Sequence, residues 1–241
     1  LAGASAQELL HLAVQFHDQV SDDQLRVPHL GQDTQQRDNI YAGDYLFTRY
    51  FDEILKTDPS PADFSTHLNA MQRILSGHLE QLQHHFDQSE TVSDYFAEIN
   101  QRTGEAFRFS AQQGAMMAGA APELVSLSAE VGASLGNAYQ VRQDIELSFN
   151  HPQDLLASLK RGQYPLPVIL TLRQPEVRQL LQKRQALTLS DVKLLQNQFD
   201  RTAVQTQLTR LTAHLNDLLS KLPAGETQAD LRQLTTALLV V

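Results

Sequence analysis

Residues 122–147, PELVSLSAEVGASLGNAYQVRQDIEL, decide the fold class. Pro122 suits the first turn of a helix, where its missing N–H costs nothing. Apolar residues recur every three or four positions, as on one face of a helix. Small residues at Ala129, Gly132 and Gly136 permit a neighbouring backbone to approach closely. The segment therefore predicts a long, closely packed helix in an all-α protein.

The same helical pattern continues through most of the chain. Apolar spacing of i, i+3 and i+4 recurs from end to end, while the alternating β-branched runs typical of strands do not occur. Further helices are expected near residues 9–17, 40–55, 61–82, 93–118, 166–173, 189–199, 202–221 and 226–239. The polar stretch 25–36 is expected to be a mobile loop. Because no linker is visible, the sequence predicts one all-helical domain over residues 1–241.

Composition limits the chemistry that the chain can support. It holds 241 residues, 41% of them hydrophobic and none of them cysteine. Disulfides, thiolate metal sites and cysteine nucleophiles are therefore excluded. The net charge of −9 disfavours binding to nucleic acid. No apolar run approaches the roughly 18 residues of a membrane span and no secretory leader is visible, so we expect a cytoplasmic protein.

Two aspartates near the end of the first helix are candidate metal ligands. Asp18 and Asp22 are spaced i and i+4, so they share one helix face. Carboxylates at this spacing suit Mg²⁺, which prefers oxygen ligands and keeps waters for a diphosphate. Taken alone, the spacing favours a solvated helix end over a metal site.

One of the acids in the largely apolar helix of residues 122–147 is Asp144, one turn after Gln140. The two share a helix face. A buried aspartate paired with a neighbouring arginine is one interpretation, and a metal or phosphate site is the other. Farther along, residues 158–167 read SLKRGQYPLP, a basic loop that either closes over a phosphate or connects two helices.

In their order, these elements resemble the trans-isoprenyl (polyprenyl) diphosphate synthase family. That family has a helix ending in His-Asp-Asp-x-x-Asp, then Gly-Asp-Tyr/Phe-Leu, Lys-Thr, Ala-Gly-Ala, Phe-Gln-x-x-Asp-Asp-x-x-Asp and Asp-Leu-x-x-Gly-Lys-x-Thr-Leu-Pro. The similar segments here are 17–22, 43–46, 102–103, 118–120, 139–147 and 158–167. Order and spacing hold over about residues 5–172.

The resemblance implies an isoprenoid-synthase-type helical bundle around a central cavity. It also implies an activity, the transfer of isopentenyl units from isopentenyl diphosphate to an allylic diphosphate with Mg²⁺. Clustered carboxylates would attract the metal, which stabilises the charge on the departing diphosphate. Apolar helix walls would shield the allylic cation from water.

Carried over by position, the resemblance implies roles for ten residues. The catalytic and metal-binding residues would be Asp18, Asp22 and Asp144. The residues in contact with diphosphate would be Arg26, Arg102, Gln140, Lys160 and Arg161. Ala13 and Val14, one turn before Asp18, would line the product tunnel, where their small size implies a long product. Ordinary helix packing explains Ala13 and Val14 as well.

The departures from the family pattern concentrate at the polar positions. Aspartates of the family are replaced by Gln19, Gln143 and Leu147, and its Asp, Lys and Thr of the last motif by Ser158, Gln163 and Pro165. Losing three of six carboxylates weakens metal binding, because each charge-assisted contact contributes about 1.5–3 kcal/mol. The family's upstream Gly-Lys-x-x-Arg-Pro element has no counterpart, so its N-terminal helices are expected to be missing.

Three hypotheses fit these residues. The first is a prenyltransferase of full or weakened activity, which needs Mg²⁺ and diphosphate. The second is a non-catalytic subunit of a heteromeric prenyl diphosphate synthase, which needs a partner chain. The third is a carrier of apolar ligands on the same scaffold, which needs neither. The resemblance implies a homodimer or a heteromer with a related synthase subunit.

Overall fold

The computed structural model describes residues 2–18, 20 and 33–239. Every regular element in these ranges is a helix, which confirms the predicted all-α class. The chain divides into two compact units, Leu1–Asn69 and Ala70–Val241, described separately below. The single domain expected over 1–241 stays a prediction. None of the helices in the described ranges is long and apolar enough to cross a membrane.

The first unit is built on a pair of helices, α1 (Ala2–Asp18) and α3 (Asp33–Leu55), followed by the start of α4 (Pro61–Gln83). The two helices of the pair pack along one another. Their buried apolar side chains are Ala6, Leu10, Ala13, Tyr50 and Ile54, spaced at helical intervals as the sequence predicts.

The loop expected over residues 25–36 is contradicted at its C-terminal end. Residues 33–36 belong to α3, so that part of the prediction is wrong, and residues 25–32 lie outside the described ranges. The helix begins early because the polar residues Asp33 and Thr34 favour a helix start that apolar periodicity does not reveal.

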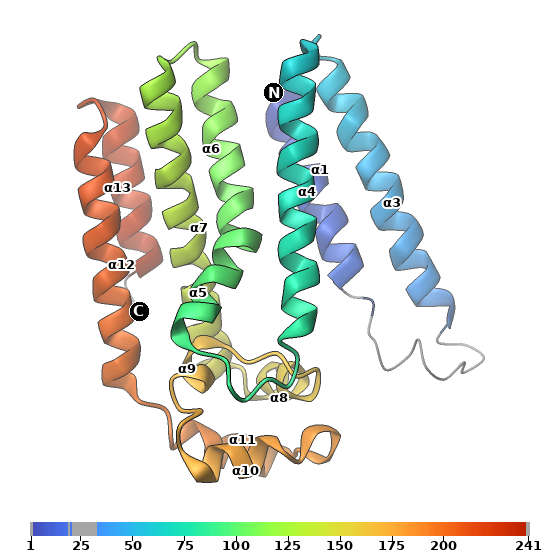
Figure 1. Cartoon of the computed structure of the whole chain (residues 1–241), viewed down its shortest axis with the longest axis vertical. Helices are drawn as coiled ribbons and strands as arrows, with labels where there is room; N and C mark the ends of the chain where they lie inside the picture. The colour runs from blue at the N-terminus through green and yellow to red at the C-terminus, as the bar shows by residue number, and fades with distance from the viewer. Residues whose placement is uncertain (1, 19, 21–32, 240–241) are drawn as a thin grey trace. The chain divides into compact units, whose positions relative to one another are not determined.

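The second unit is organised around α7 (Pro122–Asn150), which lies beside α6 (Glu105–Met117) (Figure 1). Glycines allow this close approach. A Cβ on Gly132 would lie 2.5 Å from the Phe107 carbonyl oxygen, and one on Gly136 would lie 2.7 Å from the Thr103 carbonyl oxygen. The small residues of the opening stretch therefore serve the packing that the sequence predicts.

The helix predicted over residues 93–118 contains an irregular turn. It comprises α5 (Val92–Ile99), the π-helical turn η1 (Asn100–Gly104) and α6. Thr91 and Asp94 form a capping box at its start. The backbone stays helical through η1, so the predicted extent is nearly right and only the turn is new.

The remaining helices complete the second unit. Their bounds are α8 (Pro152–Lys160), α9 (Leu166–Ile169), α10 (Pro175–Leu181), the 3₁₀ turn η2 (Arg184–Ala186), α11 (Leu189–Gln196), α12 (Arg201–Lys221) and α13 (Glu226–Leu239). In Figure 1, α8, α10 and α11 gather at the C-terminal end of α7, and α12 and α13 lie side by side. The predicted helix 166–173 ends at Ile169, and the basic loop expected from 158 begins only after Lys160.

Candidate functional site

A buried carboxylate, that of Asp144 on α7, is the centre of a polar network in the second unit. Its Oδ2 accepts hydrogen bonds from the Tyr95 hydroxyl at 2.8 Å and the Leu166 N–H at 2.9 Å. Its Oδ1 accepts one from Gln140 Nε2 at 2.8 Å. Burial raises the pKa of Asp144, while these hydrogen bonds oppose that rise by favouring the charged form. The carboxylate thus ties α5, α7 and the start of α9 together.

The network continues from Gln140 onto the π-helical turn. The Thr103 hydroxyl donates to Gln140 Oε1 at 2.9 Å. Next to it, Arg102 Nη2 donates to Glu98 Oε1 at 3.1 Å, and both side chains are largely buried. Arg102 Nε is also buried but has no acceptor among the described residues. The turn therefore holds a guanidinium with one unused donor beside the Asp144 network.

The basic loop folds back on itself before it reaches Asp144. Ser158 Oγ donates to the Gln163 carbonyl oxygen at 3.1 Å, and Arg161 Nε donates to Gln163 Oε1 at 3.1 Å. Lys160 is half-buried at the end of α8, whereas Arg161 is exposed. Neither cation hydrogen-bonds to the Asp144 network, so the structure links this loop to Asp144 through the backbone of Leu166.

A buried acid, Glu90, stands just before the N-cap of α5. It is 8% exposed, although its residue type is usually on the surface. Burial and the nearby acids Glu98, Asp87, Asp94 and Asp144 together raise the pKa of Glu90 to about 8. The second unit therefore holds a carboxyl that is mostly protonated at neutral pH.

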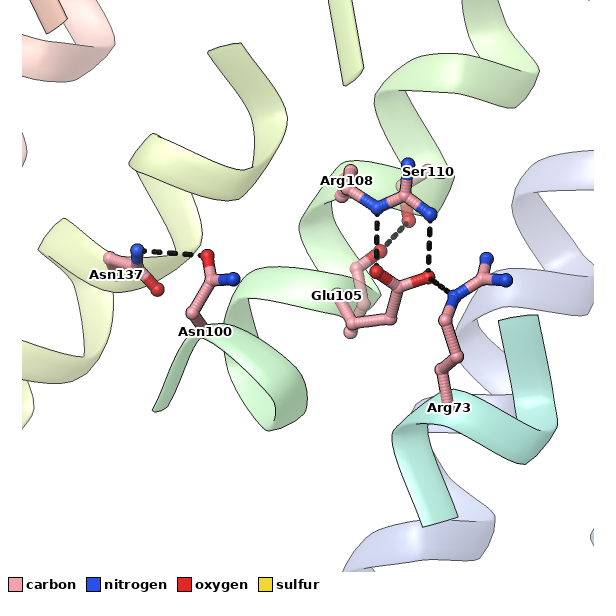
Figure 2. A network of polar contacts seen from close by, with 7 residues as sticks. Arg73, Asn100, Glu105, Arg108, Ser110 and Asn137 are labelled. Atoms are coloured by element: carbon pink, nitrogen blue, oxygen red, sulfur yellow. Dashed lines mark hydrogen bonds and ion pairs between the residues drawn. The ribbon is translucent and has the colours of Figure 1, made fainter. Parts of the chain in front are cut away.

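A second polar cluster joins α4 to α6 (Figure 2). The buried Glu105 carboxylate accepts from Arg73 Nε at 2.6 Å and from Arg108 Nε and Nη2 at 2.6 and 2.9 Å. Nearby, Asn137 Nδ2 on α7 donates to Asn100 Oδ1 at 3.2 Å. Because a buried carboxylate is costly without partners, the two arginines account for Glu105 as a structural residue.

In the first unit, the end of α1 is held against α3 by His17. Its Nε2 lies 3.2 Å from Asp44 Oδ1. A Cβ on Gly43 would lie 2.4 Å from the same nitrogen, so any larger residue there would push the ring out of its present position. The Gly-Asp pair at 43–44 therefore positions the residue that precedes Asp18.

The remaining predicted residues of this unit are placed only in part. Asp18 is exposed at the last position of α1. Asp22 and Arg26 lie outside the described residues. Ala13 is fully buried and Val14 is half-buried, and their role in a tunnel stays a prediction.

The described carboxylates do not by themselves fit a Mg²⁺ ion. Nowhere in the described ranges do three or more His, Asp or Glu side chains gather as ligands. Asp144 already accepts three hydrogen bonds from protein donors, and displacing them would leave buried donors unpaired. The role of Asp144 as a metal ligand stays a prediction. Its burial agrees with the alternative interpretation, that of a buried aspartate with protein partners. Its partners, however, are a tyrosine, an amide and a backbone N–H rather than an arginine.

Of the predicted residues in the second unit, the structure brings together Arg102, Gln140 and Asp144. Sequence reasoning missed Tyr95 and Glu90, which flank the N-terminus of α5. The separation of Tyr95 from Asp144 along the chain hides their hydrogen bond, and nothing in the local sequence marks Glu90 as buried. The only local signal is the capping box at Thr91, which marks where α5 begins.

Comparison with known proteins agrees with this architecture. A geranylgeranyl pyrophosphate synthase from Lactobacillus brevis has a similar structure, with a TM-score of 0.88, 35% identity, and coverage of 99% of this chain and 78% of that one. A dimethylallyltranstransferase from Mycobacterium tuberculosis is 28% identical over 179 residues, 72% of this chain and 54% of that protein. Heptaprenyl diphosphate synthase component 2 from Geobacillus stearothermophilus is 28% identical over 183 residues, 73% and 57% respectively.

The chain thus spans a little over half the length of these two sequence relatives. The family model described as polyprenyl synthetase matches residues 2–200, which include all the motif segments quoted above. With most of its length matched, the chain belongs to the polyprenyl synthetase family.

Proposed function

We propose that the protein is a prenyl diphosphate synthase that transfers isopentenyl units from isopentenyl diphosphate to an allylic diphosphate with Mg²⁺. The unused Arg102 Nε beside the Asp144 network carries this proposal. A buried donor without an acceptor costs free energy, and an anion such as a diphosphate supplies the missing acceptor. Guanidinium groups suit this role because their planar fork matches phosphate oxygens.

In this proposal, the residues divide into binding and positioning roles. Arg102, Lys160 and Arg161, with Arg26 from the first motif, bind diphosphate oxygens. Gln140 positions Arg102, because it accepts a hydrogen bond from the neighbouring Thr103. Asp144 positions Gln140 and the backbone of Leu166, because it accepts a hydrogen bond from each.

The metal is assigned from the sequence motif. Asp18 and Asp22 bind Mg²⁺, because their i, i+4 spacing puts both carboxylates on one helix face. The role of Asp144 as a further ligand is tested separately below. When bound, the metal supplies positive charge to the departing diphosphate. Ala13 and Val14 line the tunnel and permit a long product. The protein acts in the cytoplasm, as a homodimer or with a related subunit.

The test is product formation by the natural full-length protein. It is incubated with Mg²⁺, farnesyl diphosphate and labelled isopentenyl diphosphate, and lengthened prenyl products are separated by chromatography. We expect product from the wild type and at least about tenfold less from Arg102→Gln, because a charged contact is lost. Arg173→Gln is the matched control, since Arg173 is exposed and lies outside the network. A folded wild-type protein without product, beside an active synthase of the family, contradicts the proposal.

A non-catalytic subunit is the second candidate. The replacement of aspartates by Gln19, Gln143 and Leu147 supports it, as does a relative whose name describes a component of a heptaprenyl diphosphate synthase. This candidate predicts no product from the chain alone and product when a catalytic partner subunit is added. Product from the chain alone would remove it.

A further inference from the structure

A separate cavity of about 370 Å³ lies within the second unit, between the loop before α5, the basic loop and the end of α10. Its lining residues are Phe86, Gln88, Tyr164, Leu181, Gln182 and Arg184. None of them belongs to the motif positions assigned to diphosphate or metal. The volume falls in the range of cavities that hold small organic ligands.

The backbone on two walls of this cavity is in an unusual conformation. Phe86 has a φ of 63° and Arg184 a φ of 47°. Residues with a Cβ rarely adopt the left-handed region, and bulky residues found there gather at ligand sites and clamps. Both side chains face the cavity. In the described part of the second unit, these are the two residues with a Cβ that have positive φ, whereas the third, Asp58, belongs to the first unit.

The charge of the cavity comes from a single cation. The Arg184 guanidinium lies 4.8 Å from the centre of the Phe86 ring and is exposed. In residues 70–239, no carboxylate forms an ion pair with it. Tyr164 and Leu181, which also line the cavity, are buried and supply apolar surface. A ligand with one negative charge and a flat apolar body would complement both features.

We propose that this cavity binds a small aromatic or unsaturated carboxylate. Arg184 holds the carboxylate through its planar fork, while Phe86 and Leu181 contact the flat body. A diphosphate fits poorly, because the cavity offers one cation to several negative charges and the Asp87 carboxylate lies close to Tyr164. The site is therefore distinct in chemistry from the one proposed for the prenyl substrates.

The occupied cavity would also stabilise the basic loop. The Phe86 N–H donates to the Gly162 carbonyl oxygen at 2.9 Å. Gln185, next to Arg184, donates from Nε2 to the Lys160 carbonyl oxygen at 2.9 Å. Both walls are thus hydrogen-bonded to the loop that carries Lys160 and Arg161, and a ligand that orders the walls orders this loop.

The test uses 4-fluorobenzoate and its uncharged analogue 4-fluorobenzamide, followed by ligand-observed fluorine NMR. We expect saturable binding of the benzoate to the wild type and at least about tenfold weaker binding of the benzamide. Arg184→Gln should weaken benzoate binding by a similar factor. The matched control Arg173→Gln, which removes an exposed charge elsewhere in the same unit, should leave benzoate binding unchanged.

Two results would overturn this proposal. The first is that the wild type shows no saturable binding of 4-fluorobenzoate at concentrations up to about 20 mM, where even weak binding is detected. The other is equal binding of benzoate and benzamide. The second comparison uses the unaltered protein, so it holds even if Arg184→Gln unfolds. Because the readout is binding, its outcome is independent of whether the protein transfers prenyl groups.

Discussion

The Tyr95 hydroxyl donates a 2.8 Å hydrogen bond to Asp144 Oδ2, joining residues 49 positions apart in the sequence. Both side chains are buried. Burial, with the Asp144 charge, raises the pKa of Tyr95 well above its usual value, so its proton stays on the hydroxyl. This pair fixes the start of α5 against α7.

Replacing Tyr95 by phenylalanine should lower the free energy of unfolding by about 1–3 kcal/mol, because Asp144 loses one of three donors while remaining buried. Urea denaturation measures the change. Tyr139→Phe is the control, since Tyr139 is 37% exposed and contacts Phe107 through its ring. An equal effect of both variants would mean that the hydrogen bond contributes nothing specific.

Asp18→Ala and Asp144→Ala should both weaken Mg²⁺-dependent binding of an allylic diphosphate, by about tenfold or more. Asp18→Ala should leave stability nearly unchanged, because Asp18 is exposed. Asp144→Ala should cost about 3 kcal/mol or more, because three buried donors lose their acceptor.

Calorimetry with and without Mg²⁺ separates the roles of these two aspartates. A metal ligand affects only the Mg²⁺-dependent part of binding, whereas a positioning residue affects both parts. Unchanged binding in both variants would remove the metal-site assignment. Asp154→Ala, an exposed acid at the start of α8, is the control.

Stability should fall as pH rises from about 4.5 to about 8, with Glu90 as one cause. Its folded-state pKa of about 8 exceeds its ordinary value of 4.5, so in this window the native protein binds a proton that the unfolded chain has released. The slope from this group is at most on the order of 1 kcal/mol per pH unit.

Glu90→Gln removes this titration and should flatten the pH dependence, with a stabilising effect that is absent near pH 4 and largest above pH 8. Denaturation midpoints across the window measure it. Glu176→Gln, an exposed acid at the start of α10, should leave the slope as it is. Parallel curves for wild type and Glu90→Gln would contradict the assignment.

Glu105→Gln should destabilise the second unit by about 1–3 kcal/mol, because Arg73 and Arg108 lose their common carboxylate. Asp217→Asn is the contrast. Its pair with Lys221 is exposed on both sides, so its loss should change stability by less than about 0.5 kcal/mol. Thermal unfolding of both variants tests the difference, and similar small effects would mean that burial adds little to the Glu105 cluster.

Two glycine-to-alanine changes should have opposite signs. Gly43→Ala forces the His17 ring away and should destabilise the first unit by about 1–3 kcal/mol. Gly114→Ala should stabilise α6 by roughly 0.5–1 kcal/mol, because its added Cβ meets nothing within 4 Å. Urea denaturation measures both, and a stabilised Gly43→Ala protein would show that His17 has room to move.

Helical periodicity could predict most of the fold, since the apolar faces of α1, α3, α7 and α12 repeat over several turns. It could not predict α8 or α10. Both are short, so few repeats are available, and both begin at a proline that also signals a loop. The π-helical turn left no trace in the pattern, because its residues are polar or small.

The candidate site was less predictable than the fold. Arg102, Gln140 and Asp144 could be found because they occupy motif positions. Tyr95 could not, because its importance arises from a hydrogen bond to a residue 49 positions away. Glu90 could not, because its raised pKa arises mainly from burial. Local sequence carries no information on such contacts when no homologous sequences are aligned.

The π-helical turn at residues 100–104 also has a genetic consequence. Removing one codon there would let the backbone close into a regular α-helix. Because the wide turn holds one residue more than an α-helical turn, such a deletion would keep α5 and α6 in nearly the same rotational register. Glu105 would still face Arg73, and Phe109 would still lie in the core. A one-codon deletion inside α6 would instead turn the residues on its two sides by about 100° relative to one another, so it should be far more harmful than a deletion within residues 100–104.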